Sequence, residues 1–172
     1  MKHTLALLFI TAVFVIATQQ ASAQDVAPKP ATAARQSDIA FAALEGEWVY
    51  EKFISAGAAV PKESFPHEVH FKSPNQLIMK GITVGQVRGK DRTEVVILDD
   101  AKMPAHMDMT RLVRGDKQTA FAIYKIEGDI LTICFSRGAD RKPSTERPTA
   151  FESDPKTKAD VLVLKRKAKA SR

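Results

Sequence analysis

The chain has 172 residues, 44% of them hydrophobic and 27% charged, and a formal net charge of +6. A basic surface can attract nucleic acid or anionic lipid, but aromatic residues are not interleaved with the charges as in proteins that bind single strands, so we expect no nucleic-acid partner. Cys134 is the only cysteine, which excludes an internal disulfide and leaves stability to the hydrophobic core.

The first 23 residues have the pattern of an export signal peptide. Lys2 supplies a positive charge, residues 5–17 form an apolar run, and residues 21–23 are a small-x-small cleavage site. The apolar run of about 13 residues is shorter than the ~20 that span a bilayer, which favours cleavage over an uncleaved anchor. We therefore expect an exported protein, periplasmic or secreted, with no transmembrane segment after cleavage. Residues 24–36, rich in Pro and Ala, are expected to form a flexible linker.

A short helix is expected next. Ser37 is a favourable N-cap for a helix that runs to Leu44, with Ile39 and Phe41 on the same side as Leu44. Gly46 then ends the helix.

From residue 47 onward, short strand-like runs recur, with turn residues about every 8–12 positions and no long helical pattern. This pattern favours an antiparallel barrel or sandwich over an α/β fold. Because consecutive strands are joined by hairpins, we expect an all-β, antiparallel up-and-down barrel of about 8–10 short strands over residues 37–167. The expected strands lie at residues 47–55, 68–72, 77–80, 81–88, 93–98, 106–113, 121–127, 130–135, 149–152 and 160–166.

The clearest element is the hairpin at residues 121–135. Gly128 and Asp129 suit a tight two-residue turn. Residues 131–136 then alternate between large apolar side chains and smaller ones, which is the period of a strand with one buried face. Cys134 lies in this strand, and we expect a small buried residue there rather than a reactive thiol.

Two groups of basic residues stand out. Those in the loop 137–148 are candidates to bind a carboxylate or phosphate at an open end of the barrel; the alternative is a solvated loop whose charges are partly neutralised by Asp140 and Glu146. The second group is a basic tail at residues 168–172, expected to be solvated or to contact a negatively charged envelope surface. The candidate ligand-binding residues are Arg137, Arg141, Arg147 and Tyr124, with Lys142 beside them.

No pattern predicts catalysis, a metal or a cofactor. The residues weighed as metal ligands are not spaced as a tight metal motif, and the chain has no nucleophile elbow, Walker motif or dinucleotide fingerprint. Carboxylates meeting inside a barrel are the remaining route to acid–base chemistry. The metal candidates are His67, His70, His106, Asp99, Asp100 and Asp108. The carboxylate candidates are Glu47, Glu51, Glu68, Glu94 and Asp108.

Three stretches together carry a resemblance to a known family: residues 44–48 (LEGEW), 124–135 (YKIEGDILTICF) and 147–151 (RPTAF). With Leu98-Asp99 and His106-Met107-Asp108, they resemble an uncharacterised domain abundant in exported proteins of planctomycete bacteria, and the likeness covers residues 40–166. That family is similar to lipocalin-like β-barrels, which implies that Trp48 closes the barrel base and that Arg166 packs over it. No activity is established for the family, so the resemblance implies no catalytic residue.

These observations favour an exported barrel that binds a small hydrophobic or amphipathic ligand non-covalently, an expectation that rests on analogy of fold. An envelope-associated structural or protein-interaction module without a ligand is the main alternative. A small hydrolase or isomerase is the third.

Overall fold

The computed structural model describes residues 30–64, 68–84, 87–136, 144–156 and 158–168. A single helix in this part of the chain, α1 (Pro30–Leu44), precedes a series of antiparallel strands. A 3-10 turn, η1 (Lys62–Ser64), follows β2. The strands are β1 (Gly46–Ser55), β2 (Ala58–Ala59), β3 (Glu68–Lys72), β4 (Gln76–Val84), β5 (Val87–Asp99), β6 (Ala105–Val113), β7 (Asp116–Glu127), β8 (Ile130–Ser136) and β9 (Ala159–Arg166).

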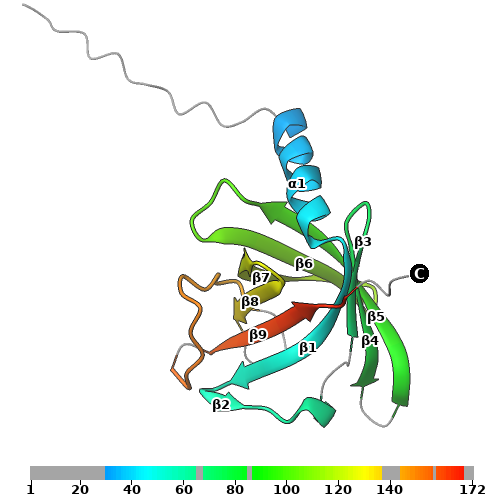
Figure 1. The fold of residues 1–172 in the computed structure, drawn as a ribbon, viewed down its shortest axis with the longest axis vertical. Helices are drawn as coiled ribbons and strands as arrows, with labels where there is room; N and C mark the ends of the chain where they lie inside the picture. Colours follow the sequence, from blue (N-terminus) through cyan, green and yellow to red (C-terminus); the bar gives the residue numbers. More distant parts are fainter. Residues whose placement is uncertain (1–29, 65–67, 85–86, 137–143, 157, 169–172) are drawn as a thin grey trace, which may run out of the picture.

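The strands close into a barrel (Figure 1). From β3 to β9 each strand pairs with the next, and β1 pairs with both β3 and β9. The short strand β2 adds to the edge of β1 only. An all-β, antiparallel up-and-down barrel with one N-terminal helix was expected, and the strand order confirms it.

Alternate residues of each strand face the barrel interior. On β6 and β7 the inward positions pair as Met107 with Ala122 and Met109 with Ala120, and these residues belong to the central core. Removing this apolar surface from water is the main source of stability for a fold without disulfides. The largest fully buried side chains of the core are Trp48, Phe71, Leu44, Met107, Leu131, Ile133, Leu164, Val69 and Val96.

A register irregularity explains why the sequence of β1 shows no clean alternation. Trp48 is buried in the core and Tyr50 packs against it, so both face inward. The pairing with β9 shifts between Tyr50 and Lys52, which is the signature of a bulge and moves later residues to the opposite face. Phe53 is therefore buried beyond the bulge, while Ile54 packs against a second, outer cluster.

Helix α1 begins at Pro30, so it is longer than the expected helix from Ser37 and includes part of the expected linker. Proline is well tolerated in the first turn of a helix, which makes Pro30 a suitable start. Phe41 is buried, but Ile39 is 73% exposed, so the prediction that they share a face was wrong. At about 100° per residue, two positions two apart point to nearly opposite sides of a helix.

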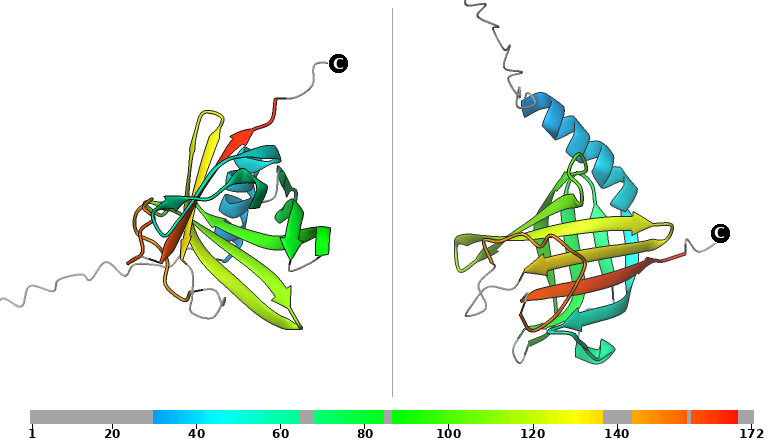
Figure 2. Two further views of the ribbon diagram at one scale, coloured as in Figure 1. Left: turned by 90° about the horizontal axis from the view of Figure 1, so that it is seen from below. Right: turned by 90° about the vertical axis from the view of Figure 1, so that its left-hand side faces the viewer.

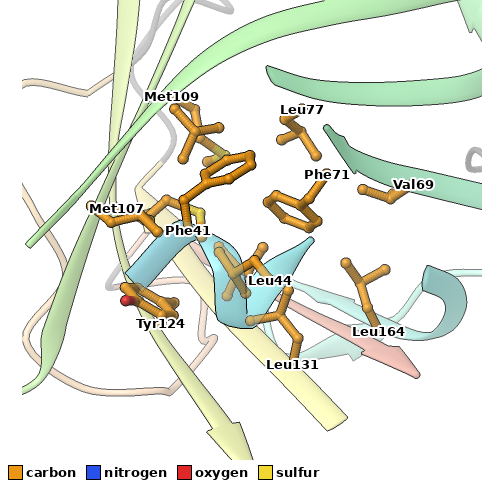
Figure 3. Packing of buried hydrophobic residues seen from close by; sticks show 14 of the residues in the cluster. Phe41, Leu44, Val69, Phe71, Leu77, Met107, Met109, Tyr124, Leu131 and Leu164 are labelled. Carbon is orange, nitrogen blue, oxygen red and sulfur yellow. The ribbon is translucent and has the colours of Figure 1, made fainter. Parts of the chain in front are cut away.

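Helix α1 lies across one end of the barrel, opposite the end that carries β2 and the β4–β5 hairpin (Figures 1 and 2). Figure 3 shows Phe41 and Leu44 pointing among core side chains from several strands. The Phe41 ring packs edge-on against Phe71 with centroids 6.1 Å apart. The Oγ atom of Ser37 accepts a hydrogen bond from the Leu98 N–H at 3.2 Å, which ties the helix to β5. The helix therefore closes this end of the barrel.

Several expected strand boundaries were wrong: β5 begins at Val87 rather than at residue 93, and β7 at Asp116 rather than at residue 121. Residues 77–80 and 81–88 do not form two separate strands, because β4 runs continuously through Gly81, whose φ of +71° is available to glycine without strain. Residues 149–152 are not a strand but part of the connection between β8 and β9. Phe151 packs against the outer cluster there, so its burial needs no strand pairing.

The central hairpin has the expected two-residue turn. Glu127 pairs with Ile130, which leaves Gly128 and Asp129 as the turn residues. Gly128 has a φ of +59°, as the first turn position of a type II′ turn requires.

Cys134 lies on the outer face of β8 beneath the connection to β9. Its side chain is fully buried, as predicted, and its thiol donates to the carbonyl of Glu152 at 3.8 Å. Burial raises the pKa of this thiol to about 11.

We expect native Cys134 to react with a disulfide reagent such as Ellman's reagent more than about 100-fold more slowly than in the urea-unfolded chain, because the thiolate is the reactive species. The rate of absorbance change in native buffer and in urea measures this directly, with Cys134→Ser as the blank. Rapid labelling of the native protein would contradict it and would show that residues 144–156 uncover β8 readily.

Candidate functional site

The barrel interior changes character along its axis. Around α1 it is filled with fully buried apolar side chains. At the opposite end, which we call the distal end, inward-facing positions are polar or only partly buried. We call six of these residues the distal cluster: Tyr50, Arg92, Glu94, Arg111, Gln118 and Asp160.

Strand register places the distal cluster inside the barrel. Arg92 pairs with Met79, and Met79 packs against the core. Arg111 pairs with Gln118 in the same inward row as Met109. The cluster therefore continues the inward faces of β5, β6 and β7 beyond the point where apolar residues fill them.

Arg92 and Glu94 form an ion pair within this cluster, with Nε and Oε1 3.0 Å apart. The Glu94 side chain is 6% exposed, whereas that of Arg92 is 35% exposed, so the arginine extends toward solvent and the carboxylate lies beneath it. A second Arg92 nitrogen donates to the Met79 sulfur at 3.0 Å. Burial lowers the pKa of Arg92, Glu94 opposes this shift, and the nearby charge of Arg111 adds to it.

Tyr50 and Asp160 form the second part of the cluster. Asp160 is 3% exposed. Burial raises the pKa of Tyr50 and the Asp160 carboxylate raises it further, while Arg92 acts in the opposite direction.

Arg111 is held differently from Arg92. Its Nη2 atom donates to the Gln118 side-chain oxygen at 3.4 Å. Among the described residues, no carboxylate lies within ion-pair distance of this guanidinium. Arg111 therefore brings a positive charge to the distal end that its own contacts do not neutralise.

Of the four predicted ligand-binding residues, the structure describes Tyr124 and Arg147, which lie on opposite sides of the barrel wall. Tyr124 faces the interior near α1, where burial raises its pKa to about 12. Arg147 lies on the other side of the barrel wall, where it pairs with Asp108 and its guanidinium lies 5.2 Å from the Phe121 ring centre. Its Nη1 also donates to the Ala122 carbonyl at 2.5 Å, so Arg147 anchors its loop to β6 and β7 rather than lining an opening. Arg137, Arg141 and Lys142 lie outside the described residues.

Glu94 is the one predicted carboxylate candidate that is buried inside the barrel. A second buried acidic residue, Asp160, was not among the candidates. Glu51 is exposed, and Asp108 is held by Arg147 on the outer surface.

Glu47, Glu68 and His70 bring their ligand-type atoms within 4.8 Å of one another on the outer surface of β1 and β3. The Lys167 ammonium lies 2.7 Å from Glu68 and 3.1 Å from Glu47, so it already supplies the cation between these carboxylates. Hydrogen bonds from Lys167 and His70 lower the pKa of Glu68. The cluster is therefore a self-contained ion-pair network. His67, a further predicted metal candidate, lies outside the described residues, as do residues 169–172 of the basic tail.

His106, another metal candidate, lies on the outer surface beside Arg147. Burial and the Arg147 charge lower its pKa below the usual 6.5, while Asp99 and Asp108 act in the opposite direction. The unfolded chain therefore binds a proton at this position more readily than the folded protein does.

We accordingly expect the His106 contribution to stability to be complete above pH 6.5 and to be lost as the pH falls below that value. The measurement is urea unfolding of the wild type and of His106→Gln at pH 7.5 and pH 5.5. The wild type should lose more stability between these pH values than the variant. An equal loss in both proteins would contradict the prediction.

Trp48 and Arg166 lie at the α1 end, opposite the distal cluster. The Arg166 guanidinium lies 4.1 Å from the Trp48 ring centre, within the range of a cation–π contact. Arg166 also donates to the carbonyls of Ala43 at 2.7 Å and Glu45 at 3.1 Å. A cation at these carbonyls satisfies the C-terminal end of α1.

Three residues of the distal cluster were not predicted as site residues from the sequence: Arg92, Arg111 and Asp160. A signal was present for Arg111, because it continues the inward alternation of Met107 and Met109. A charged residue that continues an apolar period-2 row points to a barrel end where the interior meets solvent.

Comparisons with known proteins do not name a family. No family model matches the chain, and neither a curated protein nor a solved structure matches it. Within the described residues, no helix is both long enough and apolar enough to cross a membrane.

Proposed function

We propose that this chain is an exported, lipocalin-like barrel that binds a small hydrophobic or amphipathic ligand non-covalently at its distal end. The signal-like pattern of residues 1–23 supports export, and the stretches that resemble the planctomycete domain support the family. The closed barrel is the scaffold on which such binding is common.

The gradient of burial along the interior is the observation that carries the proposal. Near α1 the core residues Trp48, Leu44 and Met107 are fully buried, so side chains fill that half. At the distal end, Met79, Ala120 and Phe135 face inward but remain partly exposed while packing against the core. Apolar wall residues next to hydrogen-bonding groups are the usual lining of a small-molecule site.

The test uses N-phenyl-1-naphthylamine (NPN), a neutral apolar dye whose fluorescence rises when it leaves water. We expect saturable, one-to-one enhancement with the purified protein. Ala120→Phe adds a ring to the partly exposed inner wall and should abolish the enhancement. Thr93→Phe adds the same ring at an exposed position of β5 and should not. Circular dichroism checks that both variants are folded.

A lack of saturable binding, or equal binding by both variants, would overturn the proposal. It would favour the second candidate, a protein-interaction module. One observation supports that alternative: Val95, Ile97 and Leu112 expose 44%, 56% and 71% of their surface on the adjoining strands β5 and β6.

A further inference from the structure

Two guanidinium groups share the distal end of the barrel. The Arg111 charge lowers the pKa of Arg92, so the two groups are close enough to repel one another. Like charges in a partly desolvated site are unfavourable unless an anion lies near them. Glu94 meets this requirement for Arg92 at 3.0 Å.

The distal cluster contains two cations, Arg92 and Arg111, and two carboxylates, Glu94 and Asp160, and Arg111 is the cation that forms no ion pair among the described residues. Within the described residues, its hydrogen-bonding partner is the neutral side chain of Gln118 at 3.4 Å. A guanidinium carries five N–H donors in a planar fork, so most of its donors are not used by this contact. The Gln118 amide adds two further N–H donors at the same place. Arg111 and Gln118 thus present donors and positive charge to anything that enters the distal end.

Apolar wall residues lie beside these donors. Ala120 follows Gln118 along the inward face of β7, and Met79 contacts Arg92 across β4 and β5. Phe135 of the neighbouring strand β8 pairs with Ala122 and stacks on Phe53 of β1 with ring centroids 6.3 Å apart. A ligand that satisfied both features would have one anionic group and an apolar body.

We propose that Arg111 and Gln118 bind the acidic group of an amphipathic acid, such as a carboxylate on a hydrocarbon body, with the body against Met79, Ala120 and Phe135. The inference rests on the proposed function and names the ligand class of the same site. A carboxylate matches the guanidinium fork in a bidentate pair. A cationic ligand would meet the repulsion of Arg111, and a neutral one would cover this charge without compensating it.

The experiment compares two probes that differ only in their head group. Decanoate and decanol are titrated separately against NPN bound to the full protein, and the displacement midpoints are compared. We expect decanoate to displace NPN at concentrations about 10- to 100-fold lower than decanol, as a charge-assisted pair implies. In Arg111→Met the preference for decanoate over decanol should disappear.

Arg114→Met is the matched control, because it removes an exposed arginine from the turn of the same hairpin. It should retain the decanoate preference. Arg111→Gln provides a second neutral variant if the methionine variant does not fold, which circular dichroism reveals.

The outcomes separate the two proposals. If NPN binds but both probes displace it equally, or if the preference survives in Arg111→Met, the acid-binding inference is overturned and the binding barrel stands. If Arg114→Met loses the preference as fully as Arg111→Met, the effect is one of net charge and the inference is also overturned. If NPN does not bind, both the binding-barrel proposal and the acid-binding inference are overturned.

Discussion

Replacing Trp48 by alanine is expected to lower the free energy of unfolding by about 3–5 kcal/mol, the usual cost of removing a large aromatic side chain from a core. Trp48 is fully buried and packs edge-on against Phe71 with centroids 6.5 Å apart. Its indole N–H donates to the Leu44 carbonyl at 2.7 Å, and Arg166 covers its ring. One substitution therefore removes buried area, a hydrogen bond and the contact that joins the helix end to the last strand.

Urea unfolding followed by far-ultraviolet circular dichroism measures this loss. Trp48→Phe is the graded control: it keeps most of the apolar area but loses the N–H, so we expect a smaller loss, of about 1–2 kcal/mol. A loss below about 1 kcal/mol in Trp48→Ala would show that the barrel end does not depend on this side chain.

The second large effect is expected at α1. Leu44→Ala should cost about 2–5 kcal/mol, because Leu44 is fully buried among side chains of the barrel wall. Ile39→Ala is the matched control on the same helix: Ile39 is 73% exposed, so its truncation should change stability by less than about 0.5 kcal/mol.

The emission of Trp48, the chain's single tryptophan, reports these transitions without a label. In the wild type, fluorescence and circular dichroism should give the same unfolding midpoint, because α1 and the strands share one core. Two separate midpoints, or similar effects of both substitutions, would contradict the view that α1 unfolds together with the barrel.

The sequence predicted the strands well where alternation was undisturbed and poorly where local geometry broke it. The hairpin around Gly128 was placed correctly, because turn chemistry and alternation agree there. In β1 the bulge between Tyr50 and Lys52 moves the buried row to the other face, and no residue type in that strand signals the shift. The helix start was placed seven residues late at Ser37, which binds Leu98 across the fold instead of capping the helix.

The candidate site was harder to predict because charge alone does not show which side of a barrel wall a residue occupies. Arg147 was predicted as a ligand-binding residue because it belongs to a basic loop, yet Asp108 holds it on the outer surface. Arg111 was not predicted as a site residue, yet its strand register places it on the inward face. The distinction depends on long-range pairing between strands, which single-residue patterns do not contain.

The pairing of β1 with β9 has a consequence for how the chain reaches its folded state. Glu45, immediately before β1, and Arg166 at the end of β9 are joined by a hydrogen bond and are 121 positions apart in sequence. Contacts between such distant segments form late and slow folding, because the entropy of closing the intervening loop is lost before the contact stabilises anything. Before β9 pairs with β1 during folding, β1 has an unpaired edge that can pair with a strand of another chain. We therefore expect refolding on the scale of milliseconds to seconds, with aggregation competing at high protein concentration.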